Sequence, residues 1–359
     1  SMTNNIKDYE EIAKNATEIR NRRSRIREAA EDPQPEEEQE GRRGPPGGAG
    51  ANRSSNPSGY LSTEKVETEK GPKVLSSIQQ IGKQGGCTAL HYAARDGNMQ
   101  SARLLIQAGA DVNQTSEGDQ SSPLLVAVIN GNYDLAKELL EAGADPNQRT
   151  GTHIWYAAYN AGRMGVDFAG ATPFWRAAYA QDVEAMKLLV KYGADHDIWT
   201  WNIIDPRRRA FFAALNEGEE QEDPSGLPPV PHGGLGVHPL HAASGVGFGT
   251  SRVAQQHRGV PDGWLPAIKY LVEELGVDPN LRDKDGLAAL HHSAARGDNE
   301  TILYLVSQGA YVTVISRRGQ TTADLANSPE QRAQPHPVTI ALLEKLGSKN
   351  NHNCRSCGG

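Results

Sequence analysis

The chain has 359 residues, a formal net charge of −7 and 37% hydrophobic residues. It contains no run of 18 apolar residues, so the sequence predicts no membrane-spanning helix and no membrane partner. Residues 1–84 carry 14 basic and 14 acidic side chains, and residues 85–359 carry 23 basic and 30 acidic ones. The acidic excess of residues 85–359 argues against a surface there that binds nucleic acid. The sequence shows no apolar leader near its start, and a cytoplasmic location is expected.

The first thirty residues are predicted to form an N-terminal helix. Ile12, Ile19 and Ile26 are seven residues apart, which is too short a pattern for a stable coiled coil. Five arginines between 20 and 27 leave a nucleic-acid-binding or partner-binding arm as an alternative, and a solvated helix is preferred.

Residues 31–73 are predicted to be a disordered linker. The stretch 31–40 is acidic, and 41–60 is rich in Gly, Pro and Ser, so neither buries enough apolar surface to offset its ordering entropy. A folded repeat domain is expected over 74–347, with apolar residues between 74 and 81 covering the open face of its first repeat.

A helix–turn–helix unit recurs from residue 85 onward. In its first copy, 85–114, Thr88 is a helix N-cap residue and Gly97 ends the first helix. A second helix follows, with apolar residues three and four apart, and Gly109 ends it. Such a unit is too small to bury its apolar faces alone, so the copies are expected to stack. The predicted starts lie near residues 85, 119, 169, 235, 285 and 318.

This pattern resembles the ankyrin repeat family, because Thr88-Ala89-Leu90-His91-Tyr92-Ala93-Ala94 matches its T-P-L-H-x-A signature at a period near 33. The resemblance implies an all-α ankyrin solenoid with short β-turn fingers. It also implies that His91, His241 and His291 are structural and bond backbone across neighbouring repeats. Two copies depart from the pattern, since Gln181 replaces a turn glycine and His238 replaces a capping threonine.

Three insertions interrupt the repeats, at 151–167, 201–236 and 245–263. Aromatic residues concentrate between 155 and 212, and two interpretations stay open. They form a small core of the insertion, or they form a binding hot spot with Tyr179 as the anchor and Trp155 or Trp199 beside it.

No motif with an established chemistry is present in the sequence. The Gly-rich stretch 245–249 lacks the strand and helix of a phosphate loop, and no metal-ligand spacing links the histidines. Cys354 and Cys357 form a CxxC pair in a tail, 348–359, that is predicted to be flexible and dispensable for folding. We therefore expect no catalytic residues, no metal and no cofactor.

The sequence predicts a non-catalytic scaffold that binds another protein through its concave surface and aromatic insertions. One alternative is an enzyme or small-ligand sensor with a closed pocket lined by Trp155 and Trp175; another is nucleic-acid binding through the arginine-rich arm. Leu290 is expected to be buried between helices, and Arg317 to lie on an exposed turn. The family pattern and the aromatic region give these candidate partner-binding residues: Arg95, Asp96, Asp119, Ile129, Asn130, Trp155, Phe168, Tyr179, Trp199, Lys284, Asp285 and Arg296, with Gln84, Cys87, Ser121, Ala171, Ala180 and Leu287 at neighbouring positions.

Overall fold

The computed structural model describes residues 85–151, 168–204, 223–247, 263–327 and 334–352, all of which belong to one unit, Glu64–Gly359. The predicted N-terminal helix, the linker, Gln84, Trp155 and the CxxC pair lie outside these residues.

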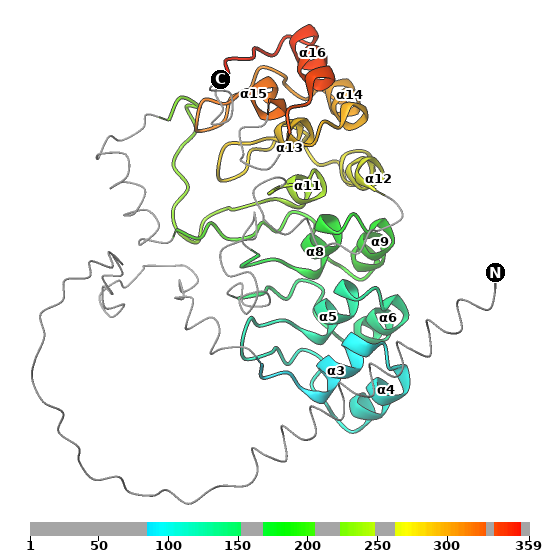
Figure 1. Cartoon of the computed structure of the whole chain (residues 1–359). Coiled ribbons are helices and arrows are strands. Elements are labelled where there is room, and N and C mark those ends of the chain that lie inside the picture. Colours follow the sequence, from blue (N-terminus) through cyan, green and yellow to red (C-terminus); the bar gives the residue numbers. More distant parts are fainter. Residues whose placement is uncertain (1–84, 152–167, 205–222, 248–262, 328–333, 353–359) are drawn as a thin grey trace, which may run out of the picture. The chain divides into compact units, whose positions relative to one another are not determined.

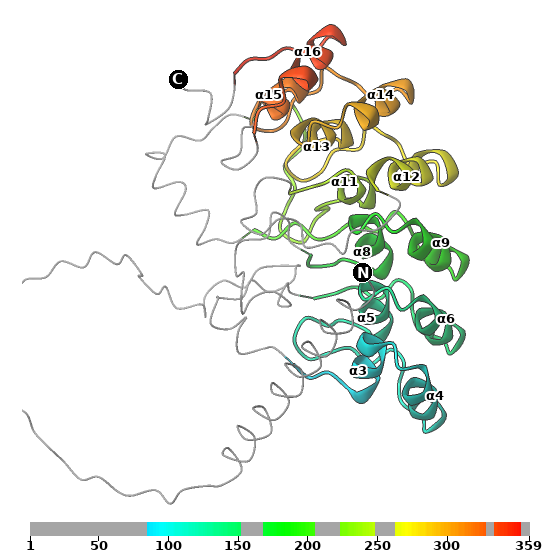
Figure 2. The same ribbon diagram turned by 45° about the vertical axis from the view of Figure 1, so that its right-hand side comes forward.

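The described residues form six pairs of short antiparallel helices stacked in one direction, so the expectation of an all-α repeat solenoid is confirmed. Figure 1 and Figure 2 show one row of inner helices and one row of outer helices. The inner helices are α3 (Ala89–Asp96), α5 (Pro123–Ile129), α8 (Pro173–Tyr179), α11 (Pro239–Ala243), α13 (Ala289–Ala295) and α15 (Thr322–Ala326). The outer helices are α4 (Met99–Gln107), α6 (Tyr133–Glu141), α9 (Val183–Lys191), α12 (Trp264–Lys269) continued by a π-helical turn η2 (Tyr270–Glu274), α14 (Asn299–Ser307) and α16 (Pro337–Lys345).

Local signals set the ends of the inner helices. The hydroxyls of Ser122 and Thr172 accept the backbone N–H groups of Leu125 and Trp175, and a proline follows each cap at the first helical position. Gly97 ends α3 with φ +66°, a left-handed conformation that suits glycine. Gln181 holds the equivalent position after α8 with φ +60°, so the third repeat keeps the same turn with a less suitable residue.

The core runs through the stack between the two rows of helices. Each inner helix packs on its neighbour, α3 on α5, α5 on α8, α8 on α11, α11 on α13 and α13 on α15. The residue two positions after each N-cap is fully or almost fully buried, and burial of this periodic position holds one repeat to the next. These side chains, one on each inner helix, are Leu90, Leu124, Phe174, Leu240, Leu290 and Ala323.

Asparagine side chains bridge successive repeats at the turns that follow three of the outer helices, α4, α6 and α12 with η2. The Asn113 side chain donates to the Gly143 carbonyl (3.0 Å) and accepts from the Asp145 N–H (2.7 Å). The same two bonds recur at Asn147 and at Asn280. Asp197 stands at this position between repeats 3 and 4, and its carboxylate accepts a hydrogen bond from His238 Nε2 instead (3.2 Å).

Replacing Asn113 by alanine should lower the free energy of unfolding by about 1–2 kcal/mol, because two inter-repeat hydrogen bonds are lost. The adjacent Gln114→Ala is the matched control, since Gln114 is exposed, and its effect should stay within about 0.5 kcal/mol. Urea unfolding of both variants measures the difference. Equal midpoints would show that the asparagine bridge does not stabilise the array.

The chain after α16 is attached more firmly than the sequence predicts. Thr322 donates its hydroxyl to Ser348 Oγ (2.8 Å), Thr321 donates to the Lys349 carbonyl (2.6 Å), and Asn351 N–H donates to Asp324 Oδ1 (2.8 Å). Residues 348–351 therefore complete the sixth repeat, and a boundary at 347 is too early.

Candidate protein-binding surface

Each inner helix is preceded by a finger loop, and the fingers are numbered from the first, before α3, to the sixth, before α15. The finger loops and the inner helices form one side of the stack, where the sequence predicts partner binding. In repeats 1 and 2 this surface is accessible. Tyr92 on α3 is 51% exposed, and Arg95 and Asp96 at the end of the same helix are exposed. Arg95 pairs with Asp96 at 2.8 Å, and its guanidinium lies 5.1 Å from the centre of the Tyr92 ring. Ile129 and Asn130 at the end of α5 are half-buried.

Asp119 has a structural environment within the second finger. It is buried, and its carboxylate accepts hydrogen bonds from Ser116 Oγ (2.7 Å) and from the Ser121 N–H (3.1 Å). His91 Nε2 lies 2.9 Å from the Ser121 carbonyl of the same finger. The second finger is thus held by its own hydrogen bonds at Asp119 and by His91 of the preceding repeat. These contacts pre-organise its outer face.

The aromatic residues of repeat 3 form a second buried cluster with Val237, Ala242 and Val246 of repeat 4. Tyr179 is only 4% exposed, and its ring stacks on Trp175 at 5.2 Å. Phe168 packs edge-on against both rings, and Trp175 Nε1 donates to the Val237 carbonyl (2.9 Å). These contacts agree with the interpretation of a small core, while a role of Phe168 or Tyr179 in partner binding stays a prediction.

Trp199 begins the fourth finger and is half-buried between repeats 3 and 4. Its ring lies 5.1 Å from the His238 ring and 5.7 Å from the His241 ring. These contacts place Trp199 in the packing of the junction, away from Tyr92.

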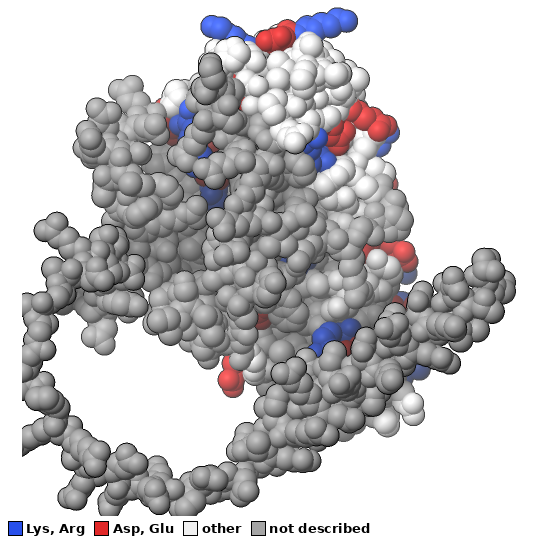
Figure 3. Space-filling view, in the orientation of Figure 1, with Lys and Arg blue, Asp and Glu red and all other residues white. Residues whose placement is uncertain are grey.

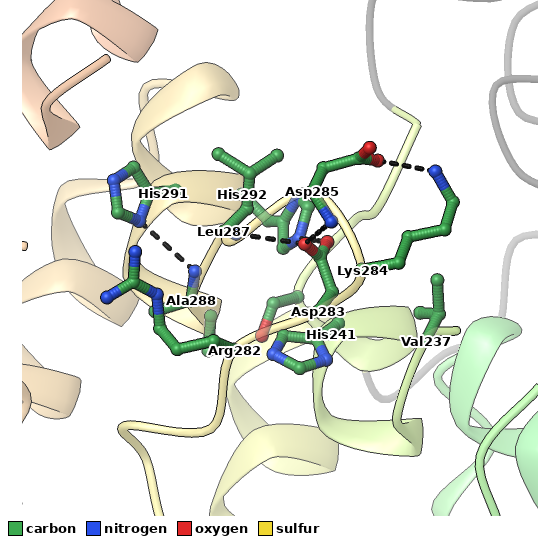
Figure 4. Close-up of polar contacts among 12 residues, drawn as sticks. Val237, His241, Arg282, Asp283, Lys284, Asp285, Leu287, Ala288, His291 and His292 are labelled. Carbon is green, nitrogen blue, oxygen red and sulfur yellow. Dashed lines mark hydrogen bonds and ion pairs between the residues drawn. The ribbon is translucent and has the colours of Figure 1, made fainter. Parts of the chain in front are cut away.

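The fifth finger is held by a buried contact between Asp283 and His292, which Figure 4 shows. Asp283 accepts hydrogen bonds from the backbone N–H groups of Asp285 and Leu287 (both 2.9 Å), and lies 3.0 Å from His292 Nε2. Burial alone would raise the pKa of Asp283, but the hydrogen bond and charge of His292 hold this pKa well below its usual range. Lys284 and Asp285, two candidate residues, pair with each other at the tip of this finger (2.6 Å).

Arg296 is buried, although its position in the repeat pattern predicts an accessible side chain. Only 4% of the side chain is exposed, and its guanidinium lies 3.7 Å from the centre of the Trp264 ring and pairs with Asp298. Burial lowers the pKa of Arg296 to about 10. Trp264 is the first residue of α12, and the sequence pattern gives no sign of this contact.

The second insertion crosses the neighbouring fingers. Residues 200–202 pair with 233–237 through backbone hydrogen bonds, so the described ends of the insertion extend the fourth finger. Residues 223–231, here called the strap, then lie against the fifth and sixth fingers. Arg317 in the sixth finger donates to the carbonyls of Lys284, Leu227 and Pro228 and pairs with Asp223. The prediction of an exposed Arg317 is therefore wrong, because the strap covers it.

The signature histidines His91, His241 and His291 are buried, and the first two are hydrogen-bonded across repeats. The expected structural role is confirmed for His91 and for His241, whose Nε2 lies 2.9 Å from the Leu281 carbonyl. In each of these rings Nδ1 accepts a hydrogen bond from a backbone N–H, so the neutral form that carries its hydrogen on Nε2 fits the site. Burial lowers the pKa of His241 and His291 to about 3 and that of His238 to about 4.

The described residues contain no group of three or more His, Cys, Asp or Glu side chains placed to hold a metal ion. A search of the same residues finds no helix long and apolar enough to cross a membrane. On the described part of the face in Figure 3, Lys and Arg lie close to Asp and Glu in small mixed groups.

Comparisons with known proteins agree with this architecture. Three ankyrin repeat family models match, over residues 69–150, 169–201 and 256–306. The Notch-regulated ankyrin repeat-containing protein B of Danio rerio is 32% identical over 105 residues, which are 29% of this chain and 86% of that protein. The human Notch-regulated ankyrin repeat-containing protein is 32% identical over 104 residues, 29% of this chain and 83% of that protein.

One solved structure is similar over a longer part of the chain. It is that of a predatory endopeptidase from Bdellovibrio bacteriovorus in complex with an immunity protein. The matching chain is 19% identical, with a TM-score of 0.46, over 72% of this chain and 98% of that one.

Proposed function

Since this chain belongs to the ankyrin repeat family, whose repeats generally mediate protein–protein interaction, we propose that it binds a protein partner through the inner surface of repeats 1 and 2. The observation that supports this choice is the exposed group of Tyr92, Arg95 and Asp96, with Ile129 and Asn130 half-buried on the next inner helix. Tyr and Arg are the side chains most often responsible for affinity at protein interfaces.

The equivalent positions farther along the stack are less available. Tyr179 belongs to a buried cluster, Arg296 is covered by Trp264, and in the fifth finger Arg317 contacts the Lys284 carbonyl while Asp285 stays exposed. A rigid partner therefore meets its most accessible contacts at the N-terminal repeats. Because Arg95 and Asp96 neutralise each other, shape and the Tyr92 ring would decide affinity more than net charge would.

The alternatives from the sequence have less support. An enzyme or ligand sensor would need Trp175 to line a pocket, whereas Trp175 is fully buried and donates its Nε1 hydrogen to a backbone carbonyl. Nucleic-acid binding relies on the arginine-rich arm, which lies outside the described residues. We therefore retain protein binding as the proposed function.

Replacing Tyr92 by alanine should weaken partner binding at least tenfold, because truncation of an aromatic anchor costs about 2 kcal/mol or more. The partner is first captured by a photoreactive amino acid placed at position 92 of the full chain. Isothermal titration then compares wild type with Tyr92→Ala.

Tyr311→Ala is the matched control, since Tyr311 is also an exposed tyrosine, 64% accessible, in the turn after α14. It should change the affinity by less than twofold. A Tyr92→Ala protein with unchanged thermal midpoint and unchanged affinity would contradict the proposed surface.

A further inference from the structure

We propose that the fifth and sixth fingers form a second recognition site, which takes a segment with an aspartate, a turn and then Leu-Pro, and that the strap occupies this site in cis. The strap has the sequence Asp-Pro-Ser-Gly-Leu-Pro-Pro-Val-Pro over 223–231 and, in its described residues, no helical turn. The chemistry of its contacts defines what a partner in trans would have to offer.

Arg317 is fixed by the fingers before it meets the strap. Its backbone N–H donates to the Asp285 carbonyl (3.0 Å) and its Nε donates to the Lys284 carbonyl (2.9 Å), so the fifth finger orients the side chain. The two terminal nitrogens then face outward and reach the Asp223 carboxylate and the carbonyls of Leu227 and Pro228. A planar guanidinium oriented in this way selects a carboxylate followed by backbone carbonyls.

The segment that fills the site has a defined shape. Asp223 Oδ1 accepts from the Ser225 N–H (2.9 Å) and from the Ser225 hydroxyl (2.5 Å), and Gly226 follows with φ +68°. This turn places Asp223 and Leu227 at the same guanidinium. A Cβ on Gly286 of the fifth finger would lie 3.0 Å from the Arg317 backbone nitrogen and 3.4 Å from Leu227 Cδ1, so glycine there lets Arg317 approach the finger beside Leu227.

These contacts are replaceable by a partner in trans. They consist of one partly exposed ion pair, two hydrogen bonds to carbonyls and one leucine contact, with Asp223 35% and Arg317 19% exposed at their side chains. A tethered segment has an effective concentration on the order of millimolar, so a free segment of equal chemistry competes poorly until the strap is released. We infer that release of the strap exposes the site.

The test uses the full chain and a fluorescently labelled peptide copying residues 219–231, followed by anisotropy. The double variant Asp223→Asn/Leu227→Ala should release the strap and bind the peptide at least tenfold more tightly than wild type. Adding Arg317→Gln to it should weaken binding again at least tenfold. A peptide with asparagine in place of its aspartate at position 223 should bind the released chain more weakly.

Asp134→Asn/Leu104→Ala is the matched control, because both residues are exposed on the outer helices of the first two repeats, and it should behave as wild type. Hydrogen exchange at 223–231 reports release, and strap amides that stay protected in the double variant would overturn the proposal. So would peptide binding that is no tighter in the released chain or is unaffected by Arg317→Gln. Binding of the partner captured at position 92 should be equal in wild type and Arg317→Gln, which separates this site from the proposed function.

Discussion

Replacing Leu290 by alanine should lower the free energy of unfolding by about 2–5 kcal/mol, because Leu290 is fully buried in the core between repeats. The loss combines the transfer energy of the removed methyl groups with the cavity they leave. A fall of this size is a large fraction of the stability of a typical domain, about 5–15 kcal/mol. Urea unfolding followed by circular dichroism measures it.

Leu303→Ala provides a matched control on the same repeat. Leu303 is 50% exposed on the outer helix α14, so the same chemical change should cost much less than at Leu290. Arg317→Ala does not serve as a neutral reference, since this side chain joins two fingers to the strap. Equal shifts for the two leucines would show that the repeat register is wrong.

Acidification should unfold the array steeply between about pH 6 and pH 4.5. His238, His241 and His291 have pKa values of about 4, about 3 and about 3 in the folded chain, against an ordinary value of 6.5. Over this range each is neutral when folded and protonated when unfolded, so the unfolded state binds more protons and stability falls as the pH falls. Three such groups correspond to about 4 kcal/mol for each pH unit.

Neighbouring carboxylates oppose this lowering of the pKa but do not cancel it, and Arg282 adds to it at His291. Asp197 and Asp195 act on His238, and Asp283 acts on His241 and His291, while burial is the largest cause in all three. The lowered pKa of Asp283 adds a loss of stability at still lower pH, in the same direction.

His238→Thr is the informative variant, because it restores the capping threonine of the repeat signature and replaces the Nδ1 acceptor of His238 by a hydroxyl oxygen. The slope of unfolding free energy against pH gives the number of protons taken up on unfolding, and this number should fall by about one. Chemical denaturation at several pH values gives the slope for both proteins. An unchanged slope would mean that His238 does not bind a proton on unfolding.

The repeats were predictable because their signals are local. Caps such as Ser122 and Thr172, and turn glycines such as Gly97, act within a few residues and recur at a regular spacing. Even the substitution at Gln181 leaves the turn in place, since the neighbouring helices determine its conformation.

The occupied part of the candidate surface was not predictable in the same way. The contact between Arg317 and Asp223 joins residues 94 apart, and no periodic pattern connects a finger to an insertion two repeats earlier. Arg296 and Tyr179 occupy positions that the repeat pattern leaves variable, and the contacts that bury them come from Trp264 at the start of α12 and from Val237 just before α11. Tyr92 lies within the repeat signature itself, and its exposure follows only from the three-dimensional arrangement.

The strap changes how the stack should come apart. In a linear array each repeat contacts only its immediate neighbours, so unfolding spreads from either end one repeat at a time. Here the strap, which belongs to the fourth finger, passes the fifth finger and contacts Arg317 in the sixth. Repeat 4 is therefore coupled directly to repeat 6, which is not its immediate neighbour. The C-terminal half should therefore lose its structure as one cooperative block, whereas repeats 1 and 2 can fray separately.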